Sequence, residues 1–195
     1  MIKLIVGLGN PGEEYESTYH NAGFLAIDYL EEKLIAEKKA DRRRPPKNIW
    51  IRESLFRYRV AGPYTLIKPL TFMNQSGEAV KKALRYFRST SEEMLVIHDD
   101  FDIPLGEAKQ VFDRGSAGHQ GVESIIRALR TKAFWRLRLG VRKKPGKAGL
   151  FALARISASD KKILYSVLSG IITKSPENDT PPGLVTIASK GRFTA

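Results

Sequence analysis

The sequence predicts a single α/β domain built as three layers, with a mixed β-sheet between two layers of helices. Apolar runs of strand length alternate along the chain with segments whose apolar residues recur at helical spacing. The 195 residues, 42% of them hydrophobic, are enough to bury one core, and no internal repeat divides them. We expect residues 1–172 to form one domain. Residues 173–195, where TKSPENDTPPG loses periodicity, are expected to form a mobile or loosely docked tail.

The first half of the chain predicts a strand, a helix and a group of antiparallel strands. The apolar run IKLIVGLG forms the first strand, and an apolar stripe from Phe24 to Leu34 predicts a helix that begins near residue 21. The basic segment DRRRPPKN predicts a loop. Residues 49–69 then predict two or three antiparallel strands with a turn at Gly62 and Pro63.

The second half continues the alternation. An apolar stripe on residues 76–87 predicts a helix, and MLVIHD and AKQVF predict strands. GVESIIRAL predicts a further helix and WRLRLGV a strand with a basic face. Residues 160–168 predict a final helix, capped by Ser157 or Ser159.

Three polar residues follow or end predicted strands, namely Asn10, Asn74 and Asp99. Functional sites in sheets of this kind gather at the carboxyl ends of the strands. We therefore expect these residues, which are far apart in the sequence, to converge on one edge of the sheet.

Charge and composition restrict the partners. Thirty-three Lys and Arg against 21 Asp and Glu give a net charge of +12 and a pI of about 9.9. This excess is typical of a protein that binds a polyanion, above all nucleic acid, and a protein that is basic without such a partner is the alternative. No apolar run approaches the roughly 20 residues that cross a bilayer, so we expect a cytosolic protein without membrane contact. The absence of cysteine excludes disulfides, thiolate zinc sites and cysteine catalysis.

A glycine motif suggests dinucleotide binding but lacks the required context. Gly7, Gly9 and Gly12 match the pattern G-x-G-x-x-G after a strand. Pro11 interrupts the pattern, however, and the glutamates that follow would repel a pyrophosphate. These glycines are better explained by a tight backbone turn beside a substrate.

The segment HDDFD offers one histidine and three carboxylates to a hard cation, but in no established ligand spacing. A buried strand that ends at His98 and a turn that begins at Asp100 explain it more simply. The sequence also lacks the G-x-S-x-G elbow of many serine hydrolases. We therefore expect neither a metal ion nor a cofactor.

His20 is the candidate general base, because an imidazole can take a proton from water near neutral pH. Asp99 is the candidate carboxylate that fixes the tautomer of this imidazole and stabilises the imidazolium. Amides from Asn10, Asn74 and the Gln120 region would bind a carbonyl and hold water, since a neutral amide can donate to a developing oxyanion. Capping and turn roles are the alternative for each residue taken singly.

Four segments, in this order, resemble bacterial peptidyl-tRNA hydrolases: GLGNPGEEYESTYHNAGF, KPLTFMNQSGEAV, HDDFDIPLGEAK and GSAGHQG. The resemblance covers residues 1 to about 170. It implies a monomeric α/β enzyme that needs no metal or cofactor and hydrolyses the ester between the peptide and the terminal ribose of peptidyl-tRNA. A non-catalytic RNA-binding paralogue of the same fold is the alternative.

The resemblance also implies roles for individual residues. His20 resembles the catalytic base, Asp99 its supporting carboxylate, and Asn10 the residue that distinguishes a blocked amino group from a free one. Residues expected to contact the tRNA end or the peptide are Tyr15, Phe72 and Asn74. Residues expected to hold tRNA phosphates are Lys109 and Arg138, and further basic residues near them in the sequence are Arg114, Arg136, Arg142, Lys143, Lys144 and Lys147.

Two residues depart from the family pattern. Gln120 stands where the family usually has asparagine, an amide implicated in tRNA contact and in positioning water. Glutamine keeps the amide but adds a methylene. Tyr19 stands where the family commonly has arginine, which removes a charge beside His20.

Overall fold

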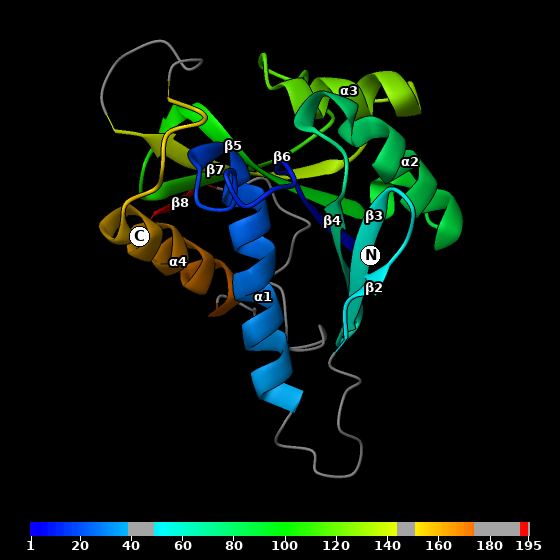
Figure 1. Cartoon of the computed structure of the whole chain (residues 1–195), viewed down its shortest axis with the longest axis horizontal. Coiled ribbons are helices and arrows are strands. Elements are labelled where there is room, and N and C mark those ends of the chain that lie inside the picture. The colour runs from blue at the N-terminus through cyan, green and yellow to red at the C-terminus, as the bar shows by residue number, and fades with distance from the viewer. Residues whose placement is uncertain (39–48, 144–150, 174–191, 195) are drawn as a thin grey trace.

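The computed structural model describes residues 1–38, 49–143, 151–173 and 192–194. Its middle layer is an eight-stranded sheet with the order β2-β3-β4-β1-β5-β7-β6-β8 (Figure 1). The strands are β1 (Leu4–Gly7), β2 (Ile51–Arg52), β3 (Phe56–Ala61), β4 (Tyr64–Pro69), β5 (Met94–Pro104), β6 (Glu107–Phe112), β7 (Trp135–Arg142) and β8 (Arg192–Thr194). Parallel pairs join β1 to β4 and β5, and β5 to β7, whereas the outer pairs are antiparallel. The predicted mixed sheet is confirmed.

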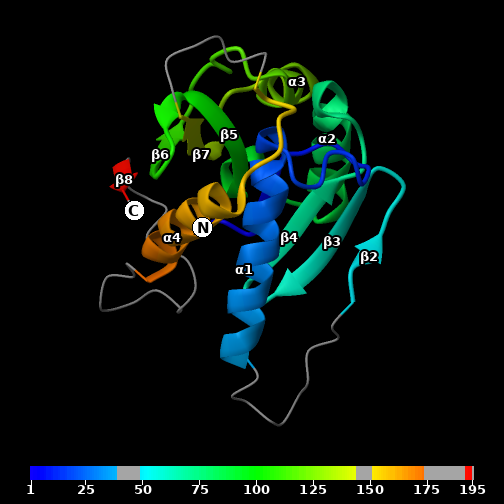
Figure 2. The same ribbon diagram turned by 60° about the vertical axis from the view of Figure 1, so that its left-hand side comes forward.

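Helices cover both faces of this sheet. The helices are α1 (Ala22–Lys38), α2 (Ser76–Tyr86), α3 (Gln120–Leu129) and α4 (Ala158–Thr173), with short 3-10 turns η1 (Tyr19–Asn21), η2 (Met73–Gln75) and η3 (Ser91–Glu93). α1 and α4 lie on one face of the sheet, and α2 and α3 lie on the other (Figures 1 and 2). Side chains of α1 and α4 form one hydrophobic core with the sheet, and side chains of α2 and α3 form another. The three-layer prediction is therefore confirmed.

β1 explains why a site forms at one edge of the sheet. It is buried along its whole length, as a central strand with parallel neighbours on both sides requires. A Cβ on Gly7 would lie 2.3 Å from the carbonyl oxygen of Gly23, so the two glycines let α1 pack closely against β1. This contact places η1 and the first turn of α1 at the carboxyl end of β1.

β5 is longer than the sequence suggests, and the expected turn at Asp100 is wrong. The strand continues through Asp99 and Asp100, which lie opposite Leu139 and Gly140 of β7, and it ends only at Pro104 after an irregularity. The partner strand supplies hydrogen bonds that override the turn preference of aspartate. Asp99 consequently lies inside a strand rather than at its end.

The remaining expectations concern loops and ends. Ser157 caps α4 as predicted, because its Oγ accepts a hydrogen bond from the backbone N–H of Asp160 at 3.1 Å. The basic loop at residues 41–48 and most of the expected tail, residues 174–191, lie outside the described residues. Arg192–Thr194 form β8, which pairs with β6 and was not predicted. Within the described ranges, no helix is long and apolar enough to cross a membrane.

Candidate active site

A cavity of about 760 Å³ opens where the chain leaves β1 and β4 and beside Asp99 of β5. Asn10, Asn74 and Asp99 all line it, which confirms the expected convergence of these residues. His20 and Gln120 line the same cavity. The fold therefore brings together the base, carboxylate and amides that the sequence analysis selected.

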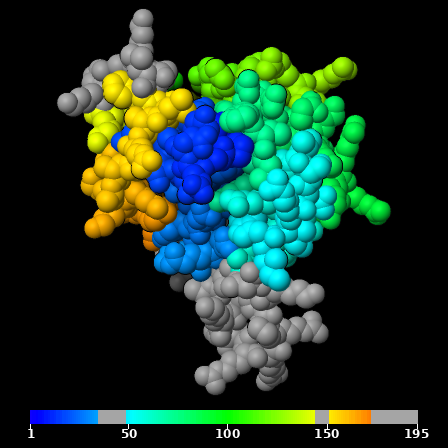
Figure 3. Space-filling model, viewed as in Figure 1, coloured from blue at the N-terminus to red at the C-terminus, as the bar shows by residue number. Residues whose placement is uncertain are grey.

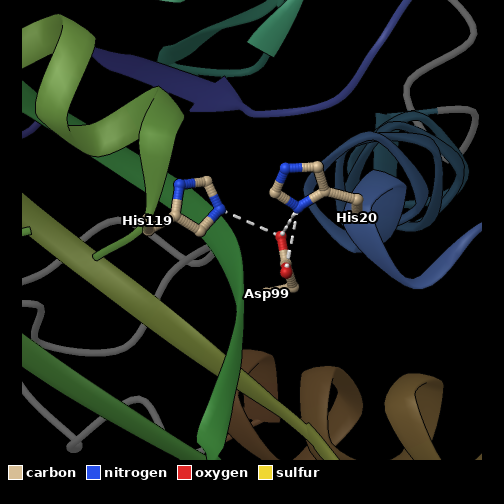
Figure 4. A group of neighbouring side chains, drawn as sticks. All are labelled: His20, Asp99 and His119. Atoms are coloured by element: carbon tan, nitrogen blue, oxygen red, sulfur yellow. Dashed lines mark hydrogen bonds and ion pairs between the residues drawn. The ribbon is translucent and has the colours of Figure 1, made fainter. Parts of the chain in front are cut away.

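His20 and Asp99 form the centre of the site (Figure 4). His20 lies in η1, where its backbone N–H donates to the carbonyl oxygen of Ala152 at 2.9 Å. Its Nδ1 lies 3.0 and 3.1 Å from the two carboxylate oxygens of Asp99. The Asp99 side chain is 1% exposed, whereas that of His20 is 16% exposed and so reaches the cavity. The expected pair is present.

His119 is a site residue that the sequence reasoning missed. Its Nε2 lies 3.0 Å from Asp99 Oδ1, so one buried carboxylate joins two imidazoles. Its Nδ1 accepts from the backbone N–H groups of Gly121 and Val122, at 3.1 and 3.3 Å, and thereby caps α3. The sequence predicts this helix from Gly121, whereas α3 begins at Gln120, and the earlier start makes His119 its N-cap.

The cap fixes the protonation of His119. Two backbone N–H groups point at Nδ1, so this atom carries a lone pair and the proton sits on Nε2, where it is donated to Asp99. Both ring nitrogens of His119 are therefore engaged in hydrogen bonds, whereas the second ring nitrogen of His20, which lines the cavity, has none described.

The surroundings keep Asp99 ionised. Burial alone would raise the pKa of Asp99, but the electrostatic attraction and hydrogen bonds of His119 and His20 outweigh burial and hold this pKa well below its usual range. His20 Nδ1–H then donates to the carboxylate, and the lone pair lies on Nε2, which points away from Asp99 (Figure 4). A fixed anion behind the ring stabilises the imidazolium that forms when His20 takes a proton.

His98, the residue before Asp99 on β5, contacts both Asp99 and His119. Burial lowers the pKa of His98 well below its usual range, so the ring is neutral. Its Nδ1 lies 2.6 Å from the carbonyl oxygen of Asp99, and its ring packs edge-on against His119 with centroids 4.5 Å apart. β5 therefore supplies both Asp99 and the His98 ring against which His119 packs.

Asn10 is held by the residue that follows His20. Its backbone N–H donates to Asn21 Oδ1 at 2.8 Å, and Asn21 Nδ2 donates back to the Asn10 carbonyl at 3.0 Å. Asn10 Oδ1 accepts from the backbone N–H of Met73 at 2.8 Å, which fixes the amide orientation. With its oxygen engaged, Asn10 has its amide NH₂ available as a donor. Asn21 is a second residue that the sequence reasoning did not select.

The sequence model of the family described as "Peptidyl-tRNA hydrolase" matches residues 4–177. The chain belongs to this family. A peptidyl-tRNA hydrolase from Nitratidesulfovibrio vulgaris (strain DSM 19637 / Miyazaki F) is 42% identical over 176 residues, covering 87% of this chain and 86% of that protein. The peptidyl-tRNA hydrolase of Aquifex aeolicus is 38% identical over 170 residues, covering 86% of this chain and 84% of the relative.

The crystal structure of peptidyl-tRNA hydrolase from Acinetobacter baumannii superimposes with a TM-score of 0.71 at 26% identity, covering 87% of this chain and 84% of that one. The fold and the hydrolase class expected from the four motifs are both confirmed.

Of the residues expected to contact substrate, Phe72, Asn74 and Gln120 line the cavity, and Tyr15 packs against Phe72. Phe72 is 53% exposed, lines the cavity, and meets Tyr15 in a T-shaped contact with ring centroids 6.3 Å apart. Asn74 lies in η2, and Gln120 opens α3 directly after His119. These positions suit contact with the end of a peptidyl-tRNA hydrolase substrate, and their roles stay predictions.

The two expected phosphate-binding residues lie beside the cavity rather than in its lining. Lys109 and Arg138 lie directly opposite each other on β6 and β7. Arg138 Nε donates to Asp100 Oδ2 at 2.5 Å, so part of its charge is already balanced by a residue of the cavity wall. Lys109 is exposed and better placed to meet a phosphate.

Other basic residues of this part of the chain differ in their surroundings, and Arg114 and Arg142 are exposed. Arg136 is buried, donates from Nη1 to the Gly115 carbonyl at 2.8 Å, and has its pKa lowered to about 10, mainly by burial. Lys143 pairs with Asp160 at 2.9 Å. Lys144 and Lys147 lie outside the described residues.

One group within the described ranges could hold a metal ion, and it includes only Asp99 of the segment HDDFD. His20, Asp99 and His119 offer ligand atoms that lie within 4.8 Å of one another. His98 and Asp100, by contrast, are engaged with a backbone carbonyl and with Arg138. The hydrogen bonds just described account for all three residues of the group without an ion.

Proposed function

We propose that the protein releases peptide and free tRNA from peptidyl-tRNA, with His20 as general base and without a metal ion. The observation that carries this proposal is the buried Asp99 carboxylate between two imidazoles: both ring nitrogens of His119 are hydrogen-bonded, whereas His20 lines the cavity with its Nε2 turned away from Asp99. Family membership supplies the substrate class. We further propose that the enzyme acts in the cytoplasm as a monomer.

The reaction follows from the positions of the groups. His20 Nε2 takes a proton from water, and the resulting hydroxide adds to the ester carbonyl carbon. Amide N–H groups of Asn10, Asn74 and Gln120 donate to the oxyanion that develops. When the tetrahedral intermediate collapses, the imidazolium returns its proton to the ribose oxygen, which leaves as the hydroxyl group of free tRNA.

We assign to Asn10 the selectivity for substrates whose aminoacyl amino group is acylated. An amide whose oxygen accepts from the Met73 backbone is oriented so that its NH₂ group is presented to the substrate. A peptide carbonyl accepts from such a donor, whereas a free ammonium group would face it with like polarity. Substrates with an acylated amino group should therefore bind in line for attack.

One assay separates an enzyme from a non-catalytic binding protein. The protein is incubated with N-acetylated and with free aminoacyl-tRNA in excess chelator, and deacylation of each is measured. We expect cleavage of the blocked substrate alone, at a rate that the chelator does not change. Binding without turnover would favour the paralogue, and a loss of activity that divalent ions restore would contradict the metal-free mechanism.

Lys109 should contribute to tRNA affinity through a phosphate contact. Neutralising one phosphate contact lowers the slope of log affinity against log salt by about 0.7–0.9, so Lys109→Gln should reduce the slope by roughly that amount. Lys33→Gln, which removes an exposed cation on α1, is the control. Affinity of uncharged tRNA is measured between low and moderate salt. Equal slopes for wild type and Lys109→Gln would remove Lys109 from the interface.

A further inference from the structure

The segment before α4 lies directly against the segment that carries His20. Residues 152–156, here called the strap, form backbone hydrogen bonds with residues 17–20. Tyr19 N–H donates to Ala154 O at 3.1 Å, His20 N–H to Ala152 O at 2.9 Å, and Ile156 N–H to Ser17 O at 2.7 Å. In the space-filling view the yellow surface around the strap abuts the dark blue N-terminal surface (Figure 3). The strap therefore fixes the backbone of the base.

The strap also forms one wall of the cavity. Ala152 and Leu153 are lining residues, and Leu153 is 58% exposed. A displacement of the strap would thus change both the orientation of His20 and the shape of the space beside it. Catalysis by a positioned base is sensitive to such displacements, because an error of about 1 Å can cost about 100-fold in rate.

A side-chain hydrogen bond joins the segment of His20 to the start of α4, which follows the strap. The hydroxyl of Tyr19 donates to Asp160 Oδ2, at the start of α4 and four residues beyond the strap. Both residues are buried, at 7% and 4% exposure. The same Asp160 oxygen accepts from Lys143 Nζ at 2.9 Å, and the Asp160 backbone N–H donates to the Ser157 cap. Asp160 is therefore held in place by Lys143, which directly follows β7, and by its own helix.

A phenol suits this position electrostatically. Burial, together with the neighbouring Asp160, raises the pKa of Tyr19 to about 12, so the hydroxyl keeps its proton near neutral pH. Lys143 already balances the charge of Asp160. Tyr19 therefore supplies a strong donor without adding a positive charge next to His20, where a cation would oppose formation of the imidazolium.

We propose that Tyr19 is a positioning residue. Its hydrogen bond to Asp160, here called the latch, holds the strap against the segment of His20 and so keeps the base in line for attack. This inference rests on the proposed function of His20. It assigns to Tyr19 no contact with the substrate, so the latch should affect turnover rather than affinity.

Tyr19→Phe removes the latch and leaves the ring in place. We expect kcat for N-acetylated aminoacyl-tRNA to fall about 10-fold, with KM and the affinity for uncharged tRNA nearly unchanged. The N–H groups of His20 and Ile156 donate hydrogen bonds between the strap and residues 17–20, so amide hydrogen exchange at these two residues should become faster. Asp160→Ala should lower kcat at least as much. Adding Tyr19→Phe to Asp160→Ala should lower it no further, because the two residues act as one contact.

Tyr58→Phe is the matched control. Tyr58 is 8% exposed, and its hydroxyl lies 3.3 Å from that of Tyr86 on the opposite side of the sheet from α4. This variant should leave kcat and strap exchange unchanged. Unaltered kcat in Tyr19→Phe, or an equal loss in Tyr58→Phe, would overturn the latch. A wild-type protein that fails to hydrolyse the ester would instead overturn the proposed function, and hydrogen exchange would still report whether Tyr19 holds the strap.

Discussion

His20→Ala is expected to lower kcat by about 10²- to 10⁴-fold, the usual contribution of a positioned general base. The loss should be this large because no neighbour can replace the imidazole. His119 Nδ1 is occupied by the backbone N–H groups of α3, and Asp99 is a weak base with its pKa held low. The rate is measured in single-turnover deacylation of N-acetylated aminoacyl-tRNA, so that product release does not mask the chemical step.

The same variant should keep its fold and its affinity for tRNA. The His20 backbone contact to Ala152 does not depend on the side chain. Free imidazole added to His20→Ala should restore part of the rate, because the vacated space still faces Asp99. Full activity of His20→Ala would exclude His20 as the general base. If the variant lost activity because it unfolded, its melting curve would differ from that of the wild type.

The sequence predicted the elements because their signals are local. The buried runs of β1 and β5 and the apolar stripe of α2 follow from strand and helix periodicity. The end of β5 was misplaced because its last residues are held by β7, a partner that lies far along the chain. Strand extension by a distant partner leaves no local signal.

Site residues were predictable where a motif marked them, whereas some of their contacts were not. Asp99 was chosen as the partner of His20, but its second partner, His119, depends on where α3 begins and on how the loop before α3 returns to β5. The role of Tyr19 depends on Asp160, which lies 141 positions away in the sequence. Such pairings exist only once the layers have packed.

Asp99 contributes to stability in a pH-dependent way. Its pKa in the folded protein lies below the ordinary carboxyl value of about 4, so the unfolded chain binds its proton first as the pH falls. The stabilisation is therefore complete above about pH 4 and is lost progressively at lower pH. In Asp99→Asn this part of the acid dependence should disappear, and melting temperatures recorded from neutral pH to strongly acidic pH would detect the difference.

Asp99→Asn should also lower kcat by about 10²- to 10⁴-fold, although it preserves size and shape. The wild-type carboxylate accepts N–H groups from both His20 and His119, whereas an asparagine offers one oxygen and an NH₂ group that cannot accept. His119 keeps its tautomer because α3 caps it, so His20 is the ring that must adapt. With its proton moved to Nε2, His20 presents a donor to water instead of a lone pair.

The pH–rate profile distinguishes this tautomer effect from a general loss of structure. Without the negative charge behind the ring, the imidazolium of His20 is less stable, so the acid limb of the profile should move to lower pH. The control is Asp28→Asn, which removes from α1 the carboxylate that pairs with Lys68 of β4. This variant should leave the profile unchanged. If Asp99→Asn kept both the rate and the acid limb of the wild type, Asp99 would not be the partner that prepares His20 for catalysis.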